Sequence, residues 1–294
     1  MSLSRQNLSI VIVTYKSEAV VYDCINSIGN NVEIIVVENS NNKKFKEKLE
    51  KNYSNVSCVL SLKNLGMGPG NNVGIKKVKK DFVLILNPDV ILEDNTIDEL
   101  ISASKNILSY AILAPISSNM DYPNYKILDP KKEIIDFKNP QKVRSVDGFA
   151  MLLDKKKLDK LLSKEYFDEN FFMYLENDDL CKRVIKTNEN IYIVPRSKIK
   201  HLGGKAVDIK YSNEVEFSRN WHWIWSKFYY QQKHYGYLNA FLKGFPKFLS
   251  SLIKYLFFTI IRKKFKQRVY LNRASGFFNA AKKKPSWYRL KVSD

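Results

Sequence analysis

The chain has 294 residues, of which 45% are hydrophobic and 13% aromatic, as expected of a folded protein with one large core or a catalytic domain plus an appendage. The formal net charge is +19, and fourteen basic residues but only one acid follow Tyr237, beside an apolar stretch. This concentration is typical of a protein at an anionic membrane surface, whereas a nucleic-acid binder spreads its charge over a recognition face, so we expect no nucleic-acid partner.

The three cysteines, Cys24, Cys58 and Cys181, lie far apart and include no CxxC pair. Such a set argues against a disulfide framework or a structural zinc site, and it fits a reducing compartment. The apolar run near the N-terminus is too short for a signal peptide and is better explained as a buried strand. We therefore expect the protein to be cytoplasmic.

The first 115 residues alternate between apolar strands and helices. We expect strands over residues 9–14, 33–37, 56–60, 82–86 and 111–115, and helices over 17–28, 43–51, 70–79 and 96–105. Ser17 is placed to cap the first helix. Apolar strands separated by helices predict a mostly parallel sheet with helices on both faces, which is an α/β fold of Rossmann-like winding.

The rest of the chain is less regular. Residues 119–144 are polar with three prolines and predict a loop-rich insertion, followed by strands over 146–153 and 191–194, a helix over 174–186 and a loop over 198–205. Residues 241–261 predict an amphipathic helix that lysines interrupt too often for it to span a membrane. We expect a catalytic domain over 1–236, with a nucleotide-binding half to about residue 115 and an acceptor half after it, and a membrane-associating helical region over 237–294.

Polar residues follow three of the predicted strands, at Thr14-Tyr15, Glu38–Ser40 and Asn87–Asp89. The carboxyl ends of parallel strands share one sheet edge, where open α/β sheets bind ligands. Taken singly, each of these residues is equally explained by turn formation. Asp89 is the best metal candidate, because Mg²⁺ or Mn²⁺ at a nucleotide diphosphate needs only one or two protein carboxylates. A turn or capping role for Asp89 has comparable weight.

Glycines are concentrated in residues 64–74, in a pattern that resembles a dinucleotide fingerprint. That fingerprint belongs in the first strand-to-helix turn, which here is residues 15–18 and contains no glycine. A nicotinamide enzyme is therefore disfavoured. The glycines instead predict either a backbone that passes close to a nucleotide or sugar, or a tight helix entry.

The remaining candidates for proton transfer or for metal or phosphate binding are acidic residues and one histidine. Glu176 lies at a predicted helix start, where the helix dipole favours a carboxylate, and a general base there would have to reach an acceptor hydroxyl. Asp179 and Arg183 are four residues apart, so Asp179 is also explained by an ion pair. His201 lies in a loop followed by two glycines, where it is either a structural residue or a ligand of a metal or phosphate.

The ordered set of these segments resembles the family-2 inverting glycosyltransferases of GT-A fold, particularly the rhamnosyltransferase-like branch. The resemblance spans residues 8 to about 205 and rests on IVIVTY, VENS, the segment 64–74, LNPDV, DGFA, FDENFFMYLENDDLCKR and HLGG. It implies a dTDP- or UDP-linked sugar donor, with the nucleoside held by Thr14, Tyr15, Glu38 and Asn39. The donor site would further include Asn64, Gly66, Asn72, Asn87 and Gly148. Asp89 matches the last carboxylate of the family's metal-binding DxD motif, whose first carboxylate is replaced here by Asn87. Asp89 would bind Mg²⁺ or Mn²⁺, and His201 would help to bind the metal or the diphosphate.

The chain departs from the family at the catalytic base. Asn177 stands where many members have the aspartate that is assigned this role, and an amide does not accept a proton near neutral pH. The role therefore passes to Glu176 first, and otherwise to Asp178 or Asp179.

The resemblance implies transfer of a sugar such as rhamnose to a glycan or polyprenyl-linked saccharide, in the synthesis of cell-surface polysaccharide, lipopolysaccharide or O-antigen. The enzyme would act as a peripheral protein at the inner face of the cytoplasmic membrane. Two alternatives remain open from the sequence: a catalytically impaired protein that binds nucleotide sugars, and a nucleotidyltransferase.

Overall fold

The structure is a computed structural model that describes residues 2–119, 123–128, 136 and 138–290. The chain forms two compact units. The first unit comprises Met1–Asp168 and Asn177–Asp208, and the second comprises Glu169–Glu176 and Ile209–Asp294. The units therefore do not divide at the expected boundary of 236/237.

The strands that the structure describes in the first unit form one sheet. They are β1 (Leu8–Thr14), β2 (Glu33–Glu38), β3 (Val56–Leu60), β4 (Phe82–Leu86), β5 (Val90–Leu92), β6 (Ile112–Ser117), β7 (Tyr125–Ile127), β8 (Gln141–Val146), β9 (Ala150–Asp154) and β10 (Ile191–His201). Their order is β3-β2-β1-β4-β9-β6-β10-β8-β7, with β5 paired to β10. The strands from β3 to β4 are parallel, as are β6 and β10, whereas β9 runs antiparallel to both β4 and β6. The predicted mostly parallel α/β fold is confirmed.

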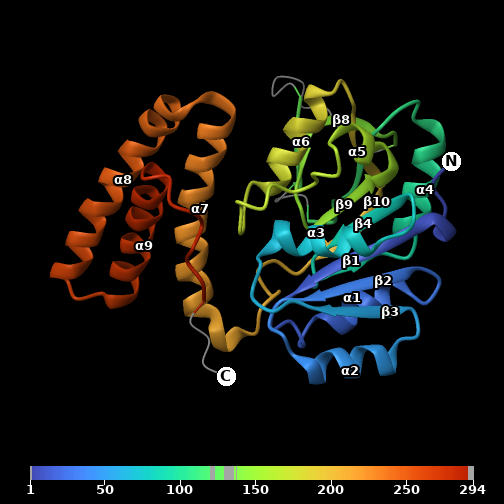
Figure 1. Cartoon of the computed structure of the whole chain (residues 1–294), viewed down its shortest axis with the longest axis horizontal. Coiled ribbons are helices and arrows are strands. Elements are labelled where there is room, and N and C mark those ends of the chain that lie inside the picture. The colour runs from blue at the N-terminus through green and yellow to red at the C-terminus, as the bar shows by residue number, and fades with distance from the viewer. Residues whose placement is uncertain (1, 120–122, 129–135, 137, 291–294) are drawn as a thin grey trace. The chain divides into compact units, whose positions relative to one another are not determined.

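Helices cover both faces of this sheet (Figure 1). They are α1 (Val21–Ile28), α2 (Lys43–Asn52), α3 (Met67–Lys77), α4 (Thr96–Asn106), α5 (Lys155–Leu161) and α6 (Glu176–Lys186), after a short 3-10 turn at Arg5–Asn7. Side chains alternate between faces along a strand. Ile10 and Ile12 of β1 accordingly pack in one core with α1, α2 and α4, and Val11 packs in the other with α3, α5 and α6. The sheet is therefore the middle layer of three.

Glycines explain how closely α3 approaches the sheet. A Cβ atom at Gly74 would lie 2.3 Å from Cγ1 of Val11, and one at Gly70 would lie 2.9 Å from Cγ1 of Val13. Gly66, the residue before α3, has φ +86°, which glycine adopts without strain. The glycine-rich segment therefore serves helix entry and helix–sheet packing, as one of the two sequence interpretations expected.

Two local predictions near the sheet edge were wrong. The first helix begins at Val21 and not at Ser17, because the Ser17 hydroxyl accepts a hydrogen bond from the backbone N–H of Tyr15 and donates one to the carbonyl of Ala206. The predicted loop over 198–205 begins later, since β10 continues to His201 and pairs with β5 and β6.

The predicted strand over 146–153 is also interrupted. β8 ends at Val146 and β9 begins at Ala150, with a turn at residues 147–149 between them. The turn lets β9 leave β8 and enter the sheet between β4 and β6. Within the polar insertion, β7 and β8 are strands, and the predicted loop at residues 120–122, 129–135 and 137 lies outside the described residues.

The second unit is built on three long helices, α7 (Ser212–Tyr235), α8 (Tyr237–Ile260) and α9 (Lys264–Ala281), after a 3-10 turn at Ile209–Tyr211 (Figure 1). Their shared core contains Trp221, Trp225, Phe228, Ala240, Phe277 and Ala280. Glycine again permits close approach, because a Cβ atom at Gly276 would lie 2.5 Å from the carbonyl oxygen of Trp221. The predicted helical, basic C-terminal extension is confirmed. Within the described residues, no helix has an apolar stretch of the length and hydropathy that crossing a membrane requires.

His222 of α7 is fully buried in this core. Its Nε2 donates to the carbonyl of Tyr288 at 2.9 Å, and its Nδ1 lies 2.9 Å from the hydroxyl of Ser286, which donates to it. Burial lowers the pKa of His222 from 6.5 to about 3, against a smaller opposing effect of the bond to Tyr288. The neutral imidazole is therefore the form that the fold stabilises.

We expect this histidine to make the second unit less stable in acid. Between pH 6.5 and about 3 the unfolded chain binds a proton at His222 that the folded chain does not, so the free energy of unfolding decreases as the pH falls. The slope for one such group is about 1.4 kcal/mol per pH unit. All four tryptophans lie in this unit, so urea unfolding followed by tryptophan fluorescence reports on it directly. His222→Gln should remove most of the dependence, and His234→Gln on the same helix should preserve it.

Candidate functional site

Pairing of β5 with β10 brings Asp89 and His201 together at one end of the sheet. His201 is the register partner of Val90, and the N–H of Leu202 donates to the carbonyl of Asp89 at 2.9 Å. The Asp89 side chain is 1% exposed, and its Oδ1 lies 3.4 Å from Nε2 of His201 without a hydrogen-bond partner. A buried carboxylate oxygen with unused lone pairs is costly unless something else satisfies it.

Residues of the neighbouring turns lie around Asp89 and His201. The Phe149 ring stacks on the His201 imidazole, with ring centroids 4.0 Å apart. The carbonyl of Phe149 accepts from the N–H of Asn87 at 2.9 Å. The side-chain oxygen of Asn87 is buried and has no hydrogen-bond partner. Phe149 was not among the site residues expected from the sequence, although it belongs to the DGFA segment that carried part of the resemblance.

These donors fit a divalent cation. Asp89 supplies an unpartnered carboxylate oxygen, His201 a neighbouring imidazole and Asn87 an unpartnered amide oxygen. Mg²⁺ and Mn²⁺ at nucleotide diphosphates use one or two protein carboxylates and take their other ligands from phosphates and water. Among the described residues, no three His, Cys, Asp or Glu side chains gather as a metal-binding group.

The predicted nucleoside residues lie at the ends of β1 and β2. Thr14 and Glu38 are register partners, and the N–H of Asn39 donates to the carbonyl of Thr14 at 2.8 Å. The Asn39 side chain donates to the carbonyl of Gly66 at 3.0 Å and accepts from Ser61, also at 3.0 Å. The structure therefore brings Thr14, Glu38, Asn39 and Gly66 together, and Tyr15 follows Thr14 directly.

Glu38 is buried, and its carboxylate is already used within its own loop. It accepts from the backbone N–H of Ser40 and Asn42, at 2.8 and 3.0 Å, and from the Ser40 hydroxyl at 2.5 Å. Burial raises the pKa of Glu38, and these hydrogen bonds partly offset the rise. The visible role of Glu38 is thus to shape the loop after β2.

Two predicted donor-site asparagines of the glycine-rich segment have structural hydrogen-bond partners. The Asn64 side chain accepts from the N–H of Gly66 at 3.1 Å, which fixes the entry to α3. Asn72 donates to the carbonyl of Phe167 at 2.8 Å and accepts from its N–H at 3.0 Å. Asn72 therefore holds a distant segment against α3.

The side chain of Asn177, which stands where many family members have an aspartate, makes a hydrogen bond that requires an amide. Its amide donates to the carbonyl of Val146 at 2.8 Å, a bond that an ionised aspartate could not make. A Cβ atom at Gly148 would lie 3.3 Å from Cβ of Asn177, so glycine suits the turn at residues 147–149.

In the same turn, burial raises the pKa of Asp147, with Asp178 acting in the same direction and Lys126 and His201 opposing it. Asp147 is a further carboxyl group near His201 that was not among the site residues expected from the sequence.

Asp178 and Asp179 each have a cationic partner. Lys126 lies 2.6 Å from the carboxylate of Asp178. The Asp179 side chain is 0% exposed and accepts from Nε of Arg183 at 2.8 Å, so the expected ion pair is present. Arg183 also donates to the carbonyls of Glu165 and Tyr166. Asp179 therefore connects α6 to the segment before it.

We expect Asp179→Asn to destabilise the first unit by about 1–3 kcal/mol, since it leaves a mostly buried guanidinium without its counter-charge. Asp178→Asn removes a more exposed pair and should cost less than about 1 kcal/mol. Urea unfolding followed by circular dichroism compares the two variants. Equal losses would show that Asp179 has no special structural role.

Glu176 belongs to the second unit, is 8% exposed and begins α6. Tyr174 and Leu175 just before it have φ values of +72° and +68°, which are strained for residues with a side chain. Helix α7 holds this segment: Nε of Arg219 donates to the Tyr174 hydroxyl at 2.9 Å, and Ser226 donates to the carbonyl of Met173 at 2.8 Å. Hydrogen bonds from α7 thus support the strained turn directly before Glu176, the candidate base.

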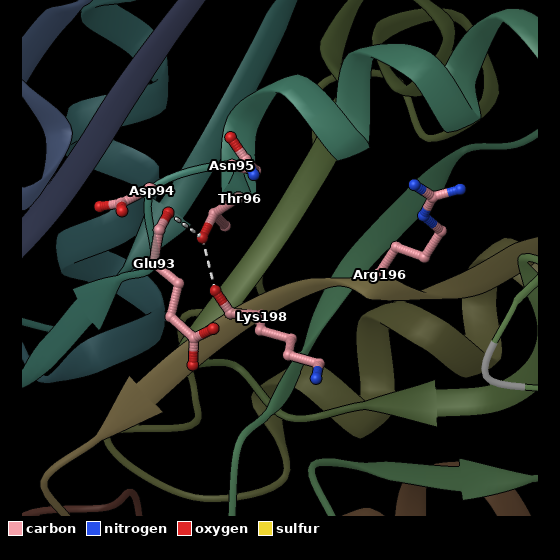
Figure 2. A pocket seen from close by; sticks show the side chains of 6 residues that line it. All are labelled: Glu93, Asp94, Asn95, Thr96, Arg196 and Lys198. Atoms are coloured by element: carbon pink, nitrogen blue, oxygen red, sulfur yellow. Dashed lines mark hydrogen bonds between the residues drawn. The ribbon is translucent and has the colours of Figure 1, made fainter.

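A hollow of about 370 Å³ lies elsewhere on the first unit, between the start of α4 and β10 (Figure 2). It is lined by Glu93, Asp94, Asn95, Thr96, Arg196 and Lys198. The Thr96 hydroxyl donates toward the carbonyls of Glu93 and Lys198, as Figure 2 shows. None of the site residues expected from the sequence lines this hollow.

Comparison with solved structures supports the fold. The crystal structure of GalNAc-T7 with UDP, GalNAc and Mn²⁺ aligns with a TM-score of 0.54 and 16% identity, over 66% of this chain and 43% of that chain. The structure of S. aureus TarS 1–349 aligns with a TM-score of 0.52 and 14% identity, over 98% of this chain and 94% of that chain. At these identities the likeness concerns the fold alone.

Comparison of sequences identifies the family. The low-salt glycan biosynthesis hexosyltransferase Agl10 of Haloferax volcanii is 27% identical over 205 residues, which are 63% of this chain and 64% of that protein. The chain thus spans a little under two thirds of the length of this relative. The model of glycosyl transferase family 2 matches residues 9–162, just over half of the chain. This protein therefore belongs to glycosyl transferase family 2.

Proposed function

We propose that this protein is an inverting, metal-dependent glycosyltransferase that moves a sugar from a dTDP- or UDP-linked donor to a saccharide acceptor. The observation that carries the proposal is the buried, unpartnered Oδ1 of Asp89 beside His201 in a family-2 chain. The printed function of the Haloferax relative, a hexosyltransferase of glycan biosynthesis, supports hexosyl transfer. We keep rhamnose as the sugar that the sequence motifs suggest.

The reaction that we propose is a direct displacement. The acceptor hydroxyl attacks the anomeric carbon from the face opposite the leaving nucleoside diphosphate, which inverts the configuration there. Glu176 accepts the proton of that hydroxyl, with Asp178 and Asp179 as the second choices. Thr14, Tyr15, Asn39 and Asn87 border the donor.

Asp89 and His201 would hold the divalent metal, which would act as a Lewis acid on the diphosphate oxygens. The donor set of one carboxylate, one imidazole and one amide oxygen supports Mg²⁺ or Mn²⁺, and the relative in fold that was crystallised with Mn²⁺ is in keeping with it.

We further propose that the acceptor is a glycan or polyprenyl-linked saccharide of cell-surface polysaccharide, lipopolysaccharide or O-antigen synthesis. The protein would then act peripherally at the inner face of the cytoplasmic membrane. Helices α8 and α9, which contain basic but no acidic residues, support an anionic membrane partner. The three buried free thiols are in keeping with a reducing compartment.

A thermal-shift screen of nucleoside diphosphates and their sugars, with and without Mn²⁺, tests the donor part of the proposal. A ligand at 100 times its Kd stabilises the folded state by about 2.7 kcal/mol. We expect a rise in melting temperature for dTDP or UDP that requires Mn²⁺. No stabilisation by any nucleoside diphosphate would contradict the proposal. Stabilisation without donor hydrolysis or transfer would instead favour an impaired nucleotide-sugar-binding protein, a reading motivated by Asn177.

A further inference from the structure

Helix α8 has an inner face that packs within the second unit. Ala240 and Ser251 are buried, Phe241 and Phe248 pack against the shared core, and a Cβ atom at Gly244 would lie 2.6 Å from the Phe277 ring. At about 100° per residue these five positions fall within an arc of about 100°, so they lie on one side of the helix. The packing of α8 on its neighbours thus uses this one side.

The outer face of α8 carries a second apolar row, which we call the outer stripe. It consists of Leu238, Leu242, Phe245, Leu249, Ile253, Leu256 and Ile260, whose side chains are 37% to 79% exposed. At about 100° per residue these seven positions fall within an arc of about 80° along the whole helix. Monomeric proteins rarely expose a continuous apolar surface of this kind without a partner for it.

Charge decides which partner suits the outer stripe. No acidic residue lies between Glu216 and Asp294, whereas seventeen lysines and arginines do. Lys243, Lys247 and Lys254 are exposed and lie together on one flank of the stripe, and a further basic run begins at Arg262, directly after the helix. A second copy of this chain would place like charges opposite each other. An occupant that is both apolar and anionic avoids this repulsion.

We propose that α8 lies in the plane of an anionic bilayer with its outer stripe inserted among the lipids and its flanking lysines at the headgroups. Helices with an apolar face and a lysine-rich flank bind membrane interfaces in this manner. Basic residues near an anionic leaflet strengthen such binding. This membrane-binding surface rests on the proposed function for its purpose, because it holds the enzyme where a lipid-linked acceptor is found.

Flotation of the full chain with liposomes tests the surface. The parent should float with vesicles of phosphatidylcholine and phosphatidylglycerol at low salt, and much less with phosphatidylcholine alone. Combining Leu242→Ser, Leu249→Ser and Ile253→Ser should reduce the floating fraction at least about tenfold, because each serine removes several inserted carbons. The matched control combines Leu62→Ser, Leu108→Ser and Ile209→Ser, which are 94%, 104% and 86% exposed outside the stripe, and it should float like the parent.

A fluorescent label distinguishes insertion of the outer stripe into the bilayer from simple charge attraction to its surface. Because the three native cysteines are buried, Ile253→Cys provides a site for an environment-sensitive dye, and Lys254→Cys provides a control position on the flank. Anionic vesicles should shift the emission of the dye at 253 to the blue by more than that at 254. Equal shifts, or none, would overturn insertion of the stripe.

The remaining outcomes are also decisive. A parent that fails to float at low salt, or a stripe variant that floats like the parent, would contradict the proposal that the outer stripe binds the membrane. Self-association of the parent that the stripe variant abolishes would assign the stripe to a second copy instead. The Mn²⁺-dependent thermal shift with nucleoside diphosphates is measured on the same variants and should be unchanged by the stripe substitutions. Its absence from the parent would contradict the proposed function, and its presence without flotation would contradict only the membrane surface.

Discussion

Replacing Glu176 by glutamine is expected to lower the rate of sugar transfer by about 10²–10⁴-fold, which is the usual loss when a general base is removed. Glutamine has nearly the same shape but accepts no proton, so the strained turn at Tyr174 and Leu175 should be retained. The affinity for the donor should stay close to that of the parent. Single-turnover transfer and donor calorimetry measure the two effects separately.

Two controls make the result specific to Glu176. Glu169→Gln changes an exposed residue of the same unit and should leave the rate unchanged. Asp178→Asn breaks the pair with Lys126 and tests the second candidate for the base. Near-parent turnover by Glu176→Gln together with a large loss in Asp178→Asn would move the role to Asp178.

Replacing Asp89 by alanine is expected to abolish metal-dependent donor binding. A residue that binds the metal directly should matter at least as much as the residues that hydrogen-bond to metal ligands, whose loss costs about 10–100-fold in metal affinity. We therefore expect calorimetry with Mn²⁺ and a nucleoside diphosphate to show affinity lowered by about 100-fold or more. His201→Ala should show a smaller loss in the same assay.

The fold should survive this substitution. The Oδ1 of Asp89 is buried without a hydrogen-bond partner, so removing the carboxylate also removes an unfavourable desolvation term. We expect a melting temperature without ligand at or above that of the parent. Asp94→Ala, an exposed aspartate just after β5, is the matched control and should bind Mn²⁺ and nucleotide normally. Unchanged binding by Asp89→Ala would contradict the metal assignment.

The layered α/β fold followed from local patterns in the sequence. The strands at Val56–Leu60 and Phe82–Leu86 have the predicted bounds. Phe82–Leu86 is buried along its whole length, as a continuous apolar run predicts. The polar residues that follow the strands were expected to meet at one edge of the sheet, since parallel strands end together, and Thr14, Glu38 and Asn39 do lie together there. That Asp89, the metal candidate, follows one of these strands was also visible in the sequence.

The details around Asp89 depended on contacts between distant segments. Its meeting with His201 comes from a three-residue strand, β5, paired to residues more than a hundred positions later, and so short a strand shows no period. The stacking of Phe149 on His201 and the bond from Asn177 to Val146 likewise join separate elements. The hydrogen bonds of the Glu38 carboxylate within its own loop were likewise not visible in the sequence.

The sequence by itself determined that the C-terminal region is helical, basic and amphipathic, because periodicity and charge are local properties. It did not determine that α7 groups with that region, since the aromatic residues of α7 become a core only when α8 and α9 supply its other walls. Nor did it determine which apolar row of α8 faces outward. The outer row is the more hydrophobic of the two, yet the close packing at Gly244 and Ala240 buries the inner row and leaves Leu242 and Ile253 exposed.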